Sequence, residues 1–238
     1  MNIDQVRSLA RSRTLASQNM KQVDQHRLDE RSGYGVALVP SPKVCKALIA
    51  FQASARAIIQ LGPPLGLTVN RPHLTLYQGY FRRDLPVPEV IGDLAVILRA
   101  ATPEPRVAFD HIVYKARGWY FLLVKRDPWL AGIHDATVRR VAEYIRLRST
   151  ATADLDDYSK GEKKSYRVYG YRYVGAAFLP HITLGRSLES DGCTGACELT
   201  KLWESAYSLR YAPMCSITFY RMGQNGMHRD TIHEVVVA

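Results

Sequence analysis

The 238-residue chain has few cysteines, which excludes a disulfide-stapled scaffold. It has 4 in all. Cys193 and Cys197 are separated by three residues, unlike the closer Cys-x-x-Cys pairs of zinc and redox sites. We therefore expect free thiols, with a local Cys193–Cys197 bridge as the open alternative.

Long apolar runs are also missing. The stretch 91–101 is interrupted by Gly92, Asp93 and Arg99, so it is too short to cross a bilayer as a helix. The N-terminal residues include Asp4 and several arginines, and they lack the apolar stretch of a secretory signal. These features predict a soluble, cytoplasmic protein without a membrane partner.

Acidic residues are fewer than basic ones: the chain has 22 Asp and Glu and 32 Lys and Arg, which gives a net charge of +10. Such an excess favours polyanionic partners through electrostatic steering and counterion release. RNA, an oligonucleotide or a cyclic nucleotide is the partner that we expect. No carboxylate cluster lies near the motifs described next, so a metal-dependent nuclease is disfavoured, and neither a metal nor another cofactor is expected.

One short cassette occurs twice. Residues 71–78 read Arg-Pro-His-Leu-Thr-Leu-Tyr-Gln, and residues 179–186 read Leu-Pro-His-Ile-Thr-Leu-Gly-Arg. Apolar and polar residues alternate in both copies, which predicts two short strands. A histidine of this kind taken alone is usually a core residue, but a repeated Pro-His-apolar-Thr-Leu pattern favours a functional pair.

Alternation also predicts which side chains share a face of each strand. His73, Thr75 and Tyr77 would lie on one face of the first strand, opposite its leucines. His181 and Thr183 would share a face of the second strand. Each strand would thus present one histidine and one threonine to the same surroundings.

The two cassettes resemble the motifs of the two-histidine phosphoesterase superfamily. This superfamily includes RNA 2′,3′-cyclic phosphodiesterases, 2′,5′-RNA ligase-like proteins and 2′,5′-oligoadenylate phosphodiesterases. The matching tetrapeptides are residues 73–76 and 181–184, and the resemblance covers residues 33–238. It implies an α+β fold of two antiparallel β lobes flanked by helices, with the motifs facing a central cleft, and a metal-independent reaction.

Along the chain, three parts are expected. Residues 1–32 are polar and form a helical N-terminal extension, residues 33–238 form the two-lobed domain, and the polar segment 148–168 is a mobile loop inserted in that domain. Strands are predicted at 34–39, 107–114, 120–125, 206–210, 215–222 and 233–237, and helices at 43–61, 88–100 and 128–147. The tyrosines of 166–173 predict a further strand, with base stacking or sheet packing as their role.

Paired histidines suggest acid and base catalysis at phosphorus. A neutral imidazole can take a proton from water or a ribose hydroxyl, while a charged one protonates the leaving oxygen. His73 and His181 are the expected catalytic residues, in interchangeable roles, and Thr75 and Thr183 would bind phosphate oxygens. Hydrolysis, transesterification and ligation stay open, as does the choice among cyclic-phosphate RNA ends, 2′,5′-linked oligonucleotides and small cyclic nucleotides.

Four further residues are weaker candidates for substrate binding. Tyr77 and Tyr173 could stack on a base, and Arg82 and Arg186 follow the two cassettes and could hold a flanking phosphate, although packing and solvated surface roles are common for both residue types. His228 is expected to have a surface or structural role. The alternative function is a non-catalytic protein that binds RNA or nucleotides in the same cleft.

Overall fold

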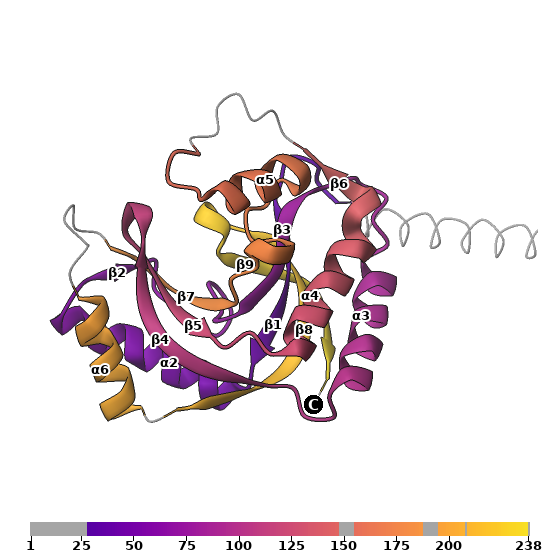
Figure 1. Cartoon of the computed structure of the whole chain (residues 1–238). Helices are drawn as coiled ribbons and strands as arrows, with labels where there is room; N and C mark the ends of the chain where they lie inside the picture. The colour runs from indigo at the N-terminus through magenta and orange to yellow at the C-terminus, as the bar shows by residue number, and fades with distance from the viewer. Residues whose placement is uncertain (1–27, 148–154, 188–194, 208, 238) are drawn as a thin grey trace, which may run out of the picture.

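A computed structural model describes residues 28–147, 155–187, 195–207 and 209–237. In these ranges the chain forms an α+β fold, a nine-stranded antiparallel sheet flanked by five α-helices (Figure 1), which confirms the predicted fold class.

The sheet divides into two lobes. The first has the order β9-β8-β1-β3-β6 and the second the order β4-β5-β7-β2. The strands of the first lobe are β1 (Tyr34–Pro40), β3 (Leu74–Phe81), β6 (Ile145–Arg146), β8 (Tyr211–Met222) and β9 (His228–Val236). Those of the second are β2 (Leu61–Gly62), β4 (Arg106–Lys115), β5 (Trp119–Val124) and β7 (His181–Ser187).

The lobes are joined at two places. Residues 106–108 of β4 pair with residues 211–213 of β8, and Leu74 of β3 pairs with Ile182 of β7. The second junction brings the two cassettes side by side, although a hundred residues separate them along the chain. Side chains with no exposed surface, including Leu76 and Leu184 of the cassettes, pack into one core beneath the junction.

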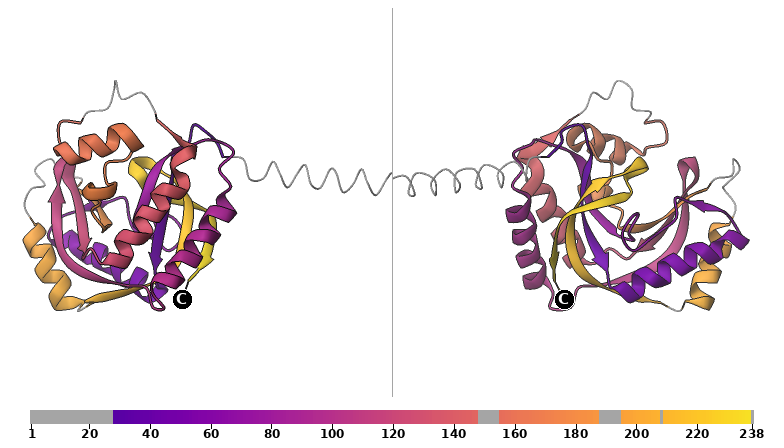
Figure 2. Two further views of the ribbon diagram at one scale, coloured as in Figure 1. Left: turned by 45° about the vertical axis from the view of Figure 1, so that its right-hand side comes forward. Right: turned by 180° about the vertical axis from the view of Figure 1, so that it is seen from behind.

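Helices α2, α3, α4 and α6 cover the outer faces of the lobes (Figures 1 and 2), whereas α5 contributes Tyr166 to the cavity between them. Helices α3 and α4 lie side by side, with α3 against β8 and β9 and α4 against β3, whereas α2 contacts β1 and β7, and α6 contacts β4. Their bounds are α2 (Pro42–Ser54), α3 (Val87–Ala101), α4 (Pro128–Val141), α5 (Lys160–Tyr169) and α6 (Ala196–Ala206). No helix within the described ranges combines the length and apolar character needed to cross a membrane.

Most predicted elements occur near where the sequence placed them. The helices predicted at 43–61 and 128–147 end earlier, at Ser54 and Val141, and strands β2 and β6 follow them. Three other segments differ in kind. Residues 160–168 belong to α5 rather than to a loop, because Ser159 and Glu162 form a reciprocal capping box and Gly170, at φ 67°, ends the helix. The expected strand at 206–210 does not form, since α6 runs to Ala206. The tyrosine series is not a strand either, because its first half lies in α5.

Only the last five residues of the expected N-terminal extension, 28–32, lie within the described ranges. Residues 1–27 lie outside the described ranges, as do 148–154. Leu28, however, is buried in the core, and the backbone N–H of Asp29 donates to the hydroxyl of Tyr34 at 2.8 Å. The last residues of the segment 1–32 therefore pack against the domain.

Candidate active site

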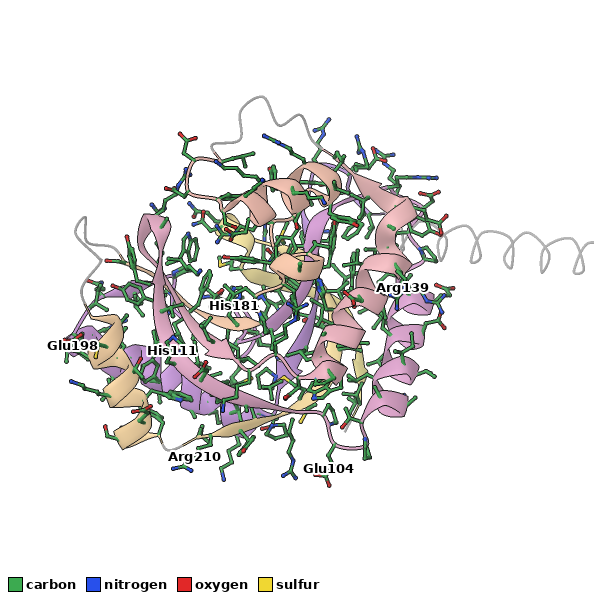
Figure 3. The ribbon with its side chains drawn as sticks, in the orientation of Figure 1. Glu104, His111, Arg139, His181, Glu198 and Arg210 are labelled. Atoms are coloured by element: carbon green, nitrogen blue, oxygen red, sulfur yellow. The ribbon has the colours of Figure 1, made fainter. Side chains whose placement is uncertain are left out.

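The two cassettes meet in a cavity of about 310 Å³ between the lobes. His73 and Thr75 line it from the start of β3, and His181 and Thr183 line it from β7. Figure 3 shows His181 in the interior of the molecule, while labelled surface residues such as Glu104 point outward. The structure thus brings together all four residues that the repeat singled out.

The register of the junction explains their arrangement. Leu74 lies opposite Ile182 in an antiparallel pair. In this antiparallel register, the residues on either side of the Leu74–Ile182 pair also face each other, so His73 comes opposite Thr183 and Thr75 comes opposite His181. Each histidine therefore has the threonine of the other cassette as its cross-strand neighbour, and the site has approximate twofold symmetry.

Both strands carry a β-bulge at the same point of the cassette. Val36 and Ala37 of β1 pair with Tyr77 and Thr75, so Leu76 is an extra residue in β3. Tyr120 and Phe121 of β5 pair with Gly185 and Thr183, so Leu184 is the extra residue in β7. A bulge changes the face on which later side chains lie.

The first bulge corrects the expectation for Tyr77. Its side chain has no exposed surface and does not line the cavity, and its hydroxyl donates to the carbonyl of Tyr169 at 2.5 Å. Gln78 lines the cavity instead. At the equivalent position of the second cassette, a Cβ on Gly185 would lie 3.1 Å from the carbonyl oxygen of Gly62, so β2 fills the space that the tyrosine ring fills in the first lobe.

A buried side chain from a helix holds each bulge. Nδ1 of His134, on α4, lies 2.8 Å from the carbonyl oxygen of Leu76. Nε2 of Gln52, on α2, donates to the carbonyl oxygen of Leu184 at 2.7 Å. These bonds satisfy carbonyls that the bulges remove from the strand ladder.

The two catalytic candidates share one tautomer. Nδ1 of His73 lies 2.7 Å from the carbonyl oxygen of Arg71, and Nδ1 of His181 lies 2.7 Å from that of Leu179. A carbonyl oxygen can only accept, so Nδ1 carries the proton of each neutral ring. The lone pair of each ring is then on Nε2, the atom available for proton transfer.

Aromatic rings enclose both imidazoles. His181 stacks on Phe121 with 3.8 Å between ring centroids, and the edge of Tyr173 approaches it at 5.4 Å. His73 is bounded by Tyr220 at 5.0 Å and His228 at 5.6 Å. This burial fixes the ring positions and removes water from around them.

Desolvation lowers the pKa of His73 to about 4 and that of His181 to about 3. For His181, the bond to Leu179 opposes the shift, while nearby Arg172 and His73 add to it. Both rings are therefore neutral near pH 7 when no anion is bound, and one must gain a proton to act as an acid.

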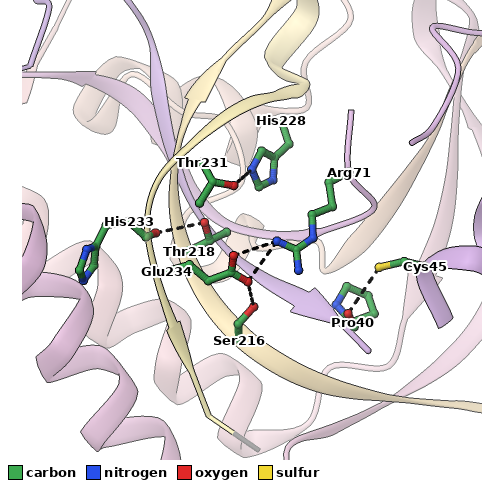
Figure 4. A network of polar contacts seen from close by, with 9 residues as sticks. All are labelled: Pro40, Cys45, Arg71, Ser216, Thr218, His228, Thr231, His233 and Glu234. Carbon is green, nitrogen blue, oxygen red and sulfur yellow. Dashed lines mark hydrogen bonds and ion pairs between the residues drawn. The ribbon is translucent and has the colours of Figure 1, made fainter. Parts of the chain in front are cut away.

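Arginines supply positive charge at the cavity wall. Arg71 lines the cavity while its Nη1 contacts both carboxylate oxygens of Glu234, at 3.1 and 2.9 Å (Figure 4). Arg172 lines it too, packed over the rings of Tyr158 and Tyr173 at 4.9 and 4.4 Å. These guanidinium groups provide donors for an anionic ligand.

The weaker candidates are divided. Tyr173 lines the cavity. Arg82 does not, and its exposed side chain pairs with Asp84. Arg186 is exposed and outside the cavity lining, and its Nε donates to the carbonyl of Arg117 at 2.6 Å, because β7 has already left the cleft at that point.

Three residues near His73 escaped the sequence reasoning. These are Gln78, which the bulge turns into the cavity, and Tyr220 and His228, which come from β8 and β9. A bulge in one cassette strand could not be seen in its alternation, and the other two residues lie about 150 positions downstream. Across the described ranges, no cluster of three or more His, Cys, Asp or Glu residues is placed to hold a metal ion.

Comparison with solved structures finds similar folds over most of the chain. The crystal structure of apo E. coli LigT is 14% identical and matches 86% of this chain and 96% of its own, with a TM-score of 0.48. The crystal structure of E. coli LigT complexed with 3′-AMP is 14% identical and matches 87% of this chain and 98% of its own, with a TM-score of 0.46. The structure of Kluyveromyces marxianus Usb1 is 12% identical and matches 88% of this chain and 98% of its own, with a TM-score of 0.47.

A scan against protein-family models and a search of curated proteins find no match. The likenesses to LigT and Usb1 concern the overall fold of the chain.

Proposed function

We propose that this chain is a metal-independent phosphodiesterase that acts on RNA or nucleotide phosphodiesters, either 2′,3′-cyclic phosphate ends or 2′,5′-linked oligonucleotides. The observation that carries the proposal is the duplicated geometry of His73 and His181. Both rings are held by the same 2.7 Å bond from Nδ1, and both line one cavity with Thr75 and Thr183.

This geometry supports in-line displacement at phosphorus. Nε2 of one neutral histidine takes the proton of the attacking water or ribose hydroxyl while the new P–O bond forms. The old P–O bond breaks, and the leaving oxygen takes the proton from Nε2 of the other histidine. The two proton transfers need one neutral and one charged imidazole at the start.

The charge on the phosphate makes this division possible. Burial keeps both empty-site imidazoles neutral, with pKa values of about 4 and 3. An anionic phosphodiester beside them favours a charged ring and raises its pKa. The hydroxyls of Thr75 and Thr183, and the guanidinium of Arg172, would hold the non-bridging oxygens as charge develops on them.

Aromatic side chains around the cavity support a nucleotide substrate. They can stack on a base, which is worth about 1–3 kcal/mol and tolerates any base. The described residues of this type are Trp119, Phe121, Tyr158, Tyr166, Tyr171 and Tyr173.

Turnover with EDTA present tests the proposal. The substrates are 2′,3′-cyclic nucleotides, RNA ending in a cyclic phosphate, and 2′,5′-linked oligoadenylate. His73→Ala and His181→Ala should each lower kcat by about 10² to 10⁴, because each removes one proton transfer. His111→Ala, which replaces an exposed histidine on β4, is the matched control and should retain activity.

The alternative is a non-catalytic protein that binds RNA in the same cleft. The same variants discriminate between the two functions. If wild type cleaves none of these substrates, and both cavity variants bind RNA as wild type does, the enzyme proposal is wrong.

A further inference from the structure

The hydrogen bonds behind His73 fix where the protons lie. Nε2 of Gln78 donates to the carbonyl oxygen of Gly226 at 2.8 Å, which settles the orientation of the amide, since a carbonyl cannot donate. The same nitrogen donates to the hydroxyl oxygen of Tyr220 at 2.7 Å. The proton of Tyr220 is then free for Nε2 of His73, 3.2 Å away.

The Tyr220 ring is built into this position. It has no exposed surface and stacks on the ring of His228, with centroids 4.5 Å apart and planes 22° from parallel. Gly35 lies opposite it on β1, and a Cβ there would come within 2.4 Å of the tyrosine ring. Only glycine at position 35 leaves room for this ring.

The second cassette has no counterpart to this hydroxyl. His181 repeats the Nδ1 bond of His73, but the rings of Phe121 and Tyr173 bound it. Among the described residues, no hydroxyl donates to its Nε2. The approximate twofold symmetry of the site therefore fails at the atom that transfers protons.

We propose that Tyr220 is a positioning residue that keeps His73 neutral, so that His73 begins the reaction as the base and His181 takes up the proton that makes it the acid. A donor to the lone pair of an imidazole stabilises its neutral form. Tyr220 does not line the cavity, so it acts through His73. This inference rests on the proposed function for its catalytic consequence, but not for the hydrogen bond itself.

Charged groups alone do not assign the two roles, because Arg172 and Lys115 disfavour a positive His181 just as Arg71 disfavours a positive His73. The difference between the two rings is the Tyr220 hydroxyl beside His73. Glu234 of β9, which opposes the effect of Arg71, is paired with Arg71 itself (Figure 4). On the same strand, desolvation lowers the pKa of His228 to about 3, so that ring brings no charge.

Proton transfer requires the Tyr220 hydroxyl to turn. Desolvation raises the pKa of Tyr220 to about 12, although bonds from Gln78 and Thr75 oppose this, so the hydroxyl stays protonated. When substrate binds, Thr75 turns its O–H from Tyr220 to a phosphate oxygen, and its oxygen becomes free to accept. When the nucleophile then gives its proton to Nε2 of His73, the O–H of Tyr220 swings to the oxygen of Thr75. Tyr220 keeps its proton throughout. Nε2 of His73 loses the hydrogen bond from Tyr220 and gains a covalently bound proton from the nucleophile.

Tyr220→Phe tests this inference, with Tyr77→Phe as the matched control. Both variants remove one hydroxyl from a fully buried tyrosine of the same lobe, and Tyr77 donates to a backbone carbonyl rather than to a histidine. Tyr220→Phe should lower kcat about tenfold with little change in KM, whereas Tyr77→Phe should leave both unchanged.

Nitrogen-15 NMR at pH 7 supplies a readout independent of turnover. In ligand-free Tyr220→Phe, the Nε2 resonance of His73 should move downfield while that of His181 stays in place. With a deoxydinucleotide bound to wild type, His181 should carry the imidazolium signal.

An unmoved His73 resonance, a charged His73 in the complex, or equal losses of kcat in the two variants would each overturn the inference. If wild type proves inactive, the proposed function fails separately, because the resonance shift still reports whether Tyr220 donates to His73.

Discussion

The threonine hydroxyls are the simplest part of the site to test at the scale of single residues. Thr75 and Thr183 line the cavity from equivalent positions. Thr75→Val and Thr183→Val keep the side-chain shape and β-branching but remove the donor. Each should lower kcat about tenfold or more with a smaller effect on KM, because the lost bond matters most when phosphate charge develops.

Serine replacements provide the control for these two threonines, since Thr75→Ser and Thr183→Ser retain the hydroxyl. Steady-state kinetics on whichever substrate is turned over would compare the four variants. If the valine and serine variants lose the same activity, the methyl group rather than the hydroxyl is important, and the phosphate-binding role is wrong.

Proton uptake on ligand binding is a second expectation for individual residues. Both empty-site imidazoles are neutral at pH 7, because burial lowers the pKa of His73 to about 4 and that of His181 to about 3. Binding an anionic phosphodiester should draw close to one proton from solution. Calorimetric titration with a deoxydinucleotide, in two buffers of different ionisation enthalpy, measures this number directly.

The variant His181→Gln separates this linkage from other proton effects. Uptake should fall toward zero in that variant, because the ring that becomes charged is missing. Equal binding enthalpies in the two buffers for wild type would mean that both rings stay neutral in the complex, which contradicts acid catalysis by either histidine.

The catalytic candidates were predictable because each is marked by its own neighbours in the chain. The Pro-His-apolar-Thr-Leu pattern occurs twice, and repetition is visible without a structure. Tyr220 was not predictable, since it reaches His73 from 147 positions away, through the pairing of β1 with β8 and of β1 with β3. Arg82 and Arg186 were placed by proximity in sequence, and proximity does not decide the face of a strand.

At the scale of elements, the paired bulges shape the cleft, and Gln52 is the residue on which the second bulge depends. Its amide nitrogen donates to the carbonyl oxygens of Leu184, at 2.7 Å, and Pro63, at 3.0 Å. Its amide oxygen accepts from the backbone N–H of Leu65 at 2.7 Å. Gln52→Leu should lower the free energy of unfolding by about 2–4 kcal/mol, because it leaves buried backbone groups unpaired.

Chemical denaturation would measure this loss, with Gln60→Leu as the matched control. Gln60 is exposed. Its replacement should change the free energy of unfolding by less than about 0.5 kcal/mol. Similar stabilities for the two variants would show that the bulge does not need the bonds from Gln52.

The elements themselves were predictable where the hydrophobic periodicity agreed with capping and breaking residues at the ends of the element. Ser41 and Pro42 marked the start of α2, and the Oγ of Ser41 accepts from the N–H of Val44 at 3.4 Å. Helix α5 was missed because its residues are polar, although the Ser159 and Glu162 capping signal was present. The bulges gave no signal, because an extra residue is defined only by the partner strand.

At the scale of the whole molecule, the closed junction of the two lobes buries several histidines at once. Desolvation lowers the pKa of His73 to about 4 and the pKa values of His181 and His228 to about 3. It also lowers the pKa of His134, on the helix that holds the first bulge. Their charged forms are disfavoured in the fold but not in the unfolded chain.

This burial predicts how stability depends on pH. Above about pH 6.5, the usual pKa of histidine, these rings are neutral in both states, and their titration has no effect on stability. As the pH falls toward 4, the unfolded chain binds protons that the fold excludes, so the free energy of unfolding decreases. Each histidine contributes up to about 1.4 kcal/mol per pH unit, and solvent entering the cleft reduces this.

Denaturation between pH 8 and 4.5 would measure the slope, and His228→Gln would identify its source. That variant removes one buried titrating ring outside the cavity lining, so stability should fall less steeply with acid than in wild type. His111→Gln, at an exposed position, is the control. A flat profile for wild type would mean that the cleft admits water freely and that the imidazoles are not desolvated. The acid catalysis proposed for this site would then start from a ring of ordinary pKa, without any need for the charge of the substrate to raise that pKa.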